Sequence, residues 1–166
     1  MNQSVFRVFV LSWQILILSA ALVSFTGIAA AQSPKGVAVV VNPDVAVDNL
    51  TVSELRRLVL GDREFWPAGI RVTLLIRAPI ARERDAVLKD LCQMTEAQFR
   101  QHWIGKVFRA DTALAPKIVY SNTMAIDLVN RTPGAITFID ASELTRGLKV
   151  VKVDGRLPGE KGYVLP

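Results

Sequence analysis

The segment KIVYSNTMAIDLVNRTPGAITFI, residues 117–139, places a strand, a helix and a second strand in immediate succession. Its first four residues suit a strand, and Ser121 or Asn122 supplies an N-cap for the helix that follows. The apolar residues then recur at helical spacing until Thr132-Pro133-Gly134 ends the helix sharply. Residues 135–139 read as the next strand, so the segment predicts a strand–helix–strand unit.

The same alternation extends toward both ends of the chain. Residues 36–41, GVAVVV, form a β-branched run typical of a strand buried on both faces. Further strands are predicted at 72–76 and 148–153, and a helix at 82–94. Capping boxes at Thr51–Glu54 and Thr95–Gln98 predict two more helices. The fold class is therefore α/β, with a central mixed or parallel sheet flanked by helices.

The N-terminal region differs from the rest in its charge. No charged residue lies between Arg7 and Lys35, and most of that stretch is apolar. Ala29-Ala30-Ala31 supplies the small side chains that a signal peptidase accepts. We therefore expect a secretion signal at residues 1–31 and a single domain at residues 32–166. The alternative is an uncleaved anchor, since about 20 apolar residues span a bilayer. The anchor would be the only membrane contact.

The remaining composition excludes several classes of function. Beyond residue 31 the chain carries 19 basic and 15 acidic residues, since Arg7 is the only charged residue removed from the totals of 20 and 15. This small, scattered excess gives weak support for an anionic ligand and none for nucleic acid. Cys92 and His102 are the only residues of their kinds, so we expect no zinc site, no nucleophile–base pair, no cofactor and no catalytic residue. Cys92 is expected in the core.

Five segments, taken in order, resemble a known family. They are Val39–Pro43, Leu50–Leu55, Trp66-Pro67-Ala68-Gly69, the strand ending at Arg77, and Thr132–Ile136. Their order and spacing resemble one lobe of the phosphate ABC transporter substrate-binding proteins, in which the last segment reads TPGAIGY. The resemblance covers residues 37–139 and is closest to small members with a single lobe. It implies one lobe of a periplasmic-binding-protein-like fold and a periplasmic location.

The resemblance also implies a ligand site. Arg77 matches an arginine that in the family precedes a Gly-Ser-Gly-Thr loop, where helix N–H groups hold the phosphate. Residues 78–81 here have no glycine and no hydroxyl, and Thr137 replaces a family glycine. Arg82 and Arg84 are offered as substitutes for the loop. Ser121 and Asn122 lie where sheets of this type gather ligand groups, at the carboxyl ends of strands.

The predicted ligand-binding residues are thus Arg77, Arg82, Ser121 and Asn122, with phosphate or a similar oxyanion as the ligand. Each also has a structural interpretation. Arg77 pairs with an acid such as Asp85, Arg82 and Arg84 lie on a solvated helix face, and Ser121 and Asn122 cap a helix. A further possibility follows from size: one lobe leaves half of a two-lobed cleft open, which a homodimer or a partner protein would complete. The alternative function is an interaction or sensor module of the cell envelope that keeps the fold without a ligand.

Overall fold

The computed structural model describes residues 35–112 and 114–166, which all belong to one compact unit, Ser33–Pro166. The predicted secretion signal, residues 1–31, lies outside the described residues. Within the described part, no helix has both the length and the apolar character needed to cross a membrane.

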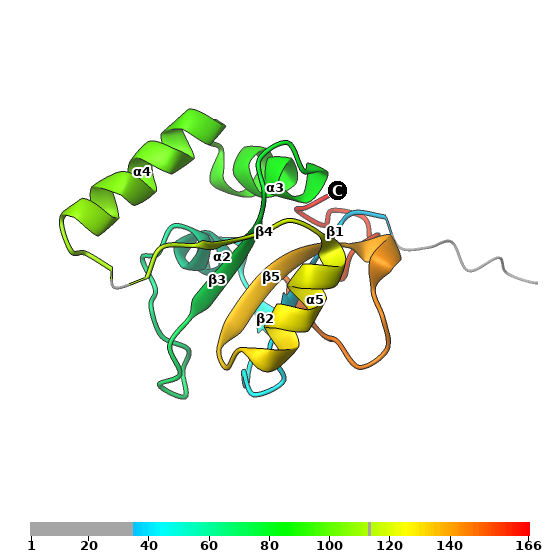
Figure 1. The fold of residues 1–166 in the computed structure, drawn as a ribbon. Helices are drawn as coiled ribbons and strands as arrows, with labels where there is room; N and C mark the ends of the chain where they lie inside the picture. The colour runs from blue at the N-terminus through cyan, green and yellow to red at the C-terminus, as the bar shows by residue number, and fades with distance from the viewer. Residues whose placement is uncertain (1–34, 113) are drawn as a thin grey trace, which may run out of the picture. The chain divides into compact units, whose positions relative to one another are not determined.

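A mixed sheet forms the centre of the unit (Figure 1). Six strands of the described residues follow the order β2-β6-β1-β5-β3-β4. β3, β4 and β5 run parallel, whereas β1 is antiparallel to both of its neighbours, β5 and β6. The predicted sheet is therefore confirmed as a mixed one. The strands are β1 Val37–Val41, β2 Asn49–Leu50, β3 Thr73–Arg77, β4 Lys117–Val119, β5 Ala135–Asp140 and β6 Lys149–Val153.

The helices are α2 Val52–Val59, α3 Arg82–Ala86, the π-helix η1 Val87–Cys92, α4 Glu96–Phe108, α5 Asn122–Arg131 and the 3₁₀ helix η2 Ala141–Glu143. Both predicted capping boxes are present at the starts of α2 and α4. The single helix predicted over residues 82–94 is wrong in type, because the chain widens into a π-helix after Ala86. β2 and η2 were not predicted, since two or three residues give no periodicity.

Two apolar clusters pack on opposite faces of the sheet. Val37, Val39 and Val41 of β1 face the cluster under α2, η1 and α4, while Ala38 and Val40 face the one under α5. All five are fully buried, which confirms the predicted strand with two buried faces. Cys92 is buried in the first cluster, where burial raises the pKa of its thiol to about 11, as expected for a core residue.

Two turns that are far apart in sequence meet where β3 and β5 begin. The Trp66 indole Nε1–H donates to the carbonyl oxygen of Gly134 at 2.9 Å, and the Thr73 N–H donates to the same oxygen at 3.0 Å. Gly134 has a φ of +70°, and a Cβ at this position would lie 2.1 Å from the carbonyl oxygen of Arg71. Only glycine satisfies both demands, so this contact fixes how the two turns pack.

Replacing Gly134 should therefore destabilise the protein strongly. Gly134→Ala combines a left-handed backbone with a clash against a main-chain oxygen, and we expect it to lower the free energy of unfolding by about 2–4 kcal/mol. Gly69→Ala is the matched control: its φ is +78°, but a Cβ there meets no atom within 4 Å. We expect a loss of about 1 kcal/mol in that variant. Urea unfolding of the purified chain measures both, and equal losses would contradict the close contact.

The indole hydrogen bond can be tested separately by comparing Trp66 with Trp103, which is also buried. Trp66→Phe removes the donor to Gly134, whereas the Nε1–H of Trp103 has no partner among the described residues. Trp66→Phe should therefore destabilise the chain by about 1 kcal/mol more than Trp103→Phe. The same urea unfolding assay makes the comparison, and an equal or larger effect at Trp103 would argue against the bond.

Candidate functional site

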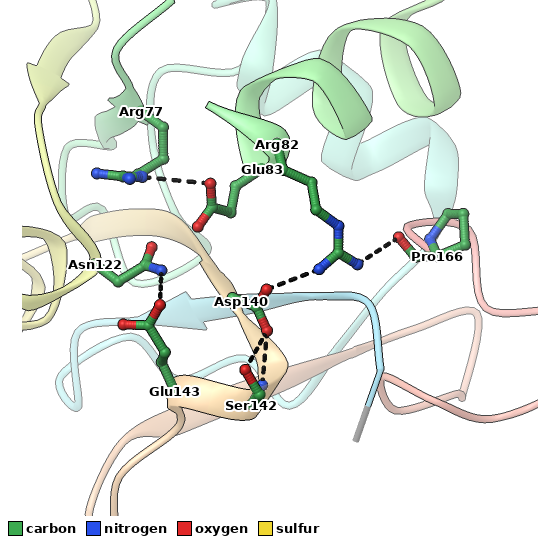
Figure 2. Close-up of polar contacts among 8 residues, drawn as sticks. All are labelled: Arg77, Arg82, Glu83, Asn122, Asp140, Ser142, Glu143 and Pro166. Atoms are coloured by element: carbon green, nitrogen blue, oxygen red, sulfur yellow. Dashed lines mark hydrogen bonds and ion pairs between the residues drawn. The ribbon is translucent and has the colours of Figure 1, made fainter. Parts of the chain in front are cut away.

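The carboxyl ends of β3, β4 and β5 meet at one edge of the sheet, because these strands are parallel. β3 ends at Arg77 and β5 ends at Asp140, while Asn122 follows β4 by three residues. Figure 2 shows the polar side chains gathered there, which we call the carboxyl-edge cluster: Arg77, Arg82, Glu83, Asn122, Asp140 and Glu143. Three of the four predicted ligand residues belong to it.

Arg77 is largely buried and only partly satisfied. Its Nε lies 3.5 Å from Oε2 of Glu83, at the outer limit of a hydrogen bond. Its Nη1 is buried and has no hydrogen-bond partner among the described residues. The interpretation that Arg77 pairs with an acid is confirmed, but the acid is Glu83 rather than Asp85, which pairs with Lys89 on the helix surface.

Arg82 is exposed and paired with the end of β5. Its Nη1 donates to Oδ2 of Asp140 at 2.7 Å, and its Nη2 lies 3.4 Å from the carbonyl oxygen of Pro166. Oδ1 of Asp140 accepts from both the N–H and the Oγ–H of Ser142. Burial by itself would raise the pKa of Asp140, but the Ser142 hydrogen bonds and the Arg82 charge outweigh it and lower the pKa. Asp140 is therefore ionised at neutral pH.

Arg84 departs from its sequence-based interpretation. It is only 5% exposed, so the solvated-face interpretation is wrong for this residue. Its Nε and Nη2 donate to the two carboxylate oxygens of Glu96, each at 2.7 Å, and its Nη1 donates to the carbonyl oxygen of Arg77 at 2.9 Å. Every guanidinium nitrogen of Arg84 thus has a protein partner, and the side chain ties α3 to α4 and to the end of β3.

Ser121 and Asn122 have different roles, and the capping interpretation is wrong for Asn122, which is the first residue of α5. The Ser121 Oγ accepts from the N–H of Met124 at 3.0 Å, which confirms Ser121 as the N-cap of α5. Asn122 is buried, and its Nδ2 donates to Oε1 of Glu143 at 2.7 Å. Its Oδ1 is buried and has no partner among the described residues. Asn122 is thus tied to η2 by its amide nitrogen, while its amide oxygen is unsatisfied.

The formal charges of the cluster nearly cancel. Arg77 and Arg82 contribute two positive charges, and the three acids Glu83, Asp140 and Glu143 contribute three negative ones. These acids were not predicted. Asp140 could have been, because it lies at the carboxyl end of a strand, which is the reason for which Ser121 was chosen. The arginines are therefore neutralised within the protein, and the site carries no net positive charge. Among the described residues, no group of acids, His or Cys is arranged to hold a metal ion.

The loop between β3 and α3 contributes no side-chain donor. The Ala78 N–H donates to the carbonyl oxygen of Val119 and continues the ladder to β4. Ile80 has a φ of +78° and is 97% exposed, an uncommon conformation for a β-branched residue. Thr137, the other departure from the family pattern, is fully buried within β5 and so lies away from solvent.

No protein-family model matches the sequence. Solved structures do match the fold. A phosphate ABC transporter substrate-binding protein from Clostridium perfringens, solved with bound phosphate, is 18% identical with a TM-score of 0.58, over 74% of this chain and 46% of that one. An ABC-type phosphate transport receptor from Vibrio cholerae is 20% identical with a TM-score of 0.56, over 76% and 49%. PstS from Borrelia burgdorferi is 16% identical with a TM-score of 0.59, over 76% and 50%.

At these identities the matches establish the fold alone. The chain spans about half the length of each of these three proteins, an extent that corresponds to a single lobe. The mixed sheet with helices on both faces agrees with the fold that the sequence resemblance implied. The chain therefore has the fold of one lobe of a periplasmic-binding-protein-like phosphate-binding protein.

Proposed function

We propose that the chain is an exported solute-binding-like protein whose carboxyl-edge cluster binds phosphate or a similar oxyanion through Arg77 and Asn122. The observation that carries the proposal is a pair of buried, unsatisfied polar atoms at one sheet edge: the Arg77 Nη1 donor and the Asn122 Oδ1 acceptor. Arg77 and Val119 are paired in register, and Asn122 follows Val119 closely, so both side chains start from neighbouring strand ends.

A donor and an acceptor together suit a protonated oxyanion. Hydrogen phosphate offers oxygens that accept from a guanidinium and a hydroxyl that donates to an amide oxygen. Leaving a buried polar atom unsatisfied costs about 1–3 kcal/mol, which a ligand that pairs with it recovers. The binding proteins with the same fold support this assignment, since one of them was solved with phosphate.

The charge balance limits the affinity. Glu83 and Asp140 already neutralise the two arginines, and Glu143 adds a further negative charge near Asn122. A single lobe also leaves the ligand open to water, so its hydrogen bonds compete with those of the solvent. We therefore propose weak binding by the chain alone, with a homodimer or a partner protein covering the open side.

A ligand-free interaction module is the second candidate. The paired arginines and the exposed, left-handed Ile80 favour it, because this loop presents an apolar side chain where an anion-binding loop would present donors. Strained residues of this kind often occur at functional surfaces. The two candidates differ in one measurement, the heat released on adding phosphate.

Isothermal titration of the purified chain with phosphate tests the first candidate. We expect a Kd of roughly 1 mM, equivalent to about 4 kcal/mol of binding free energy. Arg77→Gln should weaken binding about tenfold or more, because a charge-assisted hydrogen bond is lost. Arg57→Gln, which removes the same charge from an exposed site in no ion pair of the described residues, should leave the Kd unchanged.

Sulfate provides the ligand control for this titration. It carries no proton at neutral pH and so has no hydroxyl to donate to Asn122 Oδ1, and it should bind more weakly than phosphate. Absence of heat at tens of millimolar phosphate would reject the oxyanion site and leave the interaction module as the better explanation.

Export is tested on the full chain expressed in a bacterial host. Small residues before Gln32 suit a signal peptidase, so the secreted product should begin at Gln32 by intact mass and N-terminal sequencing. Replacing Ala29 and Ala31 by Leu should block this cleavage. A wild-type product that keeps residues 1–31 and sediments with membranes would instead support the uncleaved anchor.

A further inference from the structure

A second candidate surface is a groove of about 700 Å³ between α4 and the β3–β4 side of the sheet. Its lining is mainly apolar and includes no member of the carboxyl-edge cluster. Figure 1 shows α4 standing apart from the strands. One wall of the groove is the helix α4 and the other is the edge strand β4. They offer different chemical groups to a partner.

One side of the helix α4 packs against the rest of the protein, and its other side is exposed at the groove. Phe99 and Trp103 are buried, and His102 and Lys106 lie within hydrogen-bond distance of the Leu60 and Gly61 carbonyl oxygens, at 2.9 and 3.0 Å. The groove flank presents, beside the buried Phe99 and Trp103, three exposed apolar side chains, those of Ile104, Val107 and Phe108, the last of them 90% exposed. An exposed apolar flank of this kind marks a binding surface when it borders a groove.

The strand wall is a free sheet edge. β4 is the last strand of the sheet and pairs only with β3 among the described residues. The Ala78 N–H donates to the carbonyl oxygen of Val119, so the peptide groups of Val119 point toward β3 and those of Ile118 point away from the sheet. Ile118 pairs in register with Ile76, and the side chains of both line the groove. The edge therefore offers a main-chain donor and acceptor beside an apolar surface.

The unpaired charge at the groove is positive. Arg100 lines the groove and is exposed, and none of the ion pairs of the described residues involves it. Arg84 and Glu96, which also line the groove, neutralise each other. A second copy of the chain would bring the same unpaired positive charge to the interface. Electrostatic complementarity therefore favours an acidic occupant over self-association.

We propose that the α4–β4 groove binds an extended segment of a partner protein that is rich in apolar and acidic residues. The segment would add a strand to β4 through the peptide groups of Ile118 and place alternate side chains against α4. An acidic residue of the segment would face Arg100. This interaction does not depend on the carboxyl-edge cluster, so it holds whether or not that cluster binds phosphate.

Selection from a phage library of random octapeptides tests the proposal on the purified chain. Selection on the wild-type chain should enrich peptides that alternate apolar residues and carry net negative charge. Selection on the variant Arg100→Glu should instead enrich peptides with net positive charge, because the unpaired charge at the groove is reversed. The matched control Lys152→Glu reverses the charge of an exposed lysine elsewhere and should enrich the wild-type set.

Synthesised versions of the enriched peptides then test the contact itself by fluorescence anisotropy. Phe108→Ser should weaken binding about tenfold, and N-methylation of alternate peptide nitrogens, which prevents strand pairing, should do the same. Circular dichroism should show each variant folded, as expected for exposed positions. The proposal fails if no peptide is enriched, or if the charge preference of the enriched peptides survives the charge reversal. It also fails if N-methylation does not weaken binding, or if sedimentation shows the wild-type chain dimerising through Phe108.

Discussion

The close approach of Gly134 to the carbonyl oxygen of Arg71 is the contact on which the site depends. It brings the Trp66 turn against the start of β5, and the shared hydrogen bonds to the Gly134 oxygen align β3 with β5 from Thr73 and Ala135 onward. Because the two strands start in register and run parallel, Arg77 and Asp140 reach the same edge. A main-chain contact at one end of the sheet thus decides which side chains meet at the other.

Electrostatics then decide what that edge can bind. Glu83 and Asp140 pair with Arg77 and Arg82, the arginines that would otherwise attract an anion. The guanidinium nitrogens of Arg84 are all bonded within the protein, where they join α3 to α4. What remains is one unsatisfied donor and one unsatisfied acceptor rather than a cradle of positive charge. The molecule has the fold of a binding-protein lobe but balances the charges of this cluster internally, so the proposed weak recognition of a protonated oxyanion fits the cluster better than strong capture of a dianion.

Much of the fold could be predicted from local patterns. The capping boxes at Thr51 and Thr95, the buried strand β1 and the Ser121 cap all depend on neighbouring residues, so spacing revealed them. The π-helix after Ala86 was missed because its apolar positions fit an ordinary helical period equally well. In the site, Arg77 was predicted from the family resemblance, and Asn122 from its position after the carboxyl end of a strand. Their partners Glu83 and Glu143 were not, since the choice among nearby acids depends on side-chain direction in the folded chain.

The sequence by itself determined an α/β alternation, a core strand with two buried faces and a glycine turn at Thr132-Pro133-Gly134, because each follows from side-chain type and short-range spacing. Only the tertiary structure decided that Trp66 donates a hydrogen bond to that turn, that Arg84 is buried against Glu96, and that Arg82 forms an ion pair with Asp140. It also decided that α4 leaves an apolar flank beside the free edge of β4. These contacts join residues distant along the chain, and no local pattern specifies which of the available partners lies within reach.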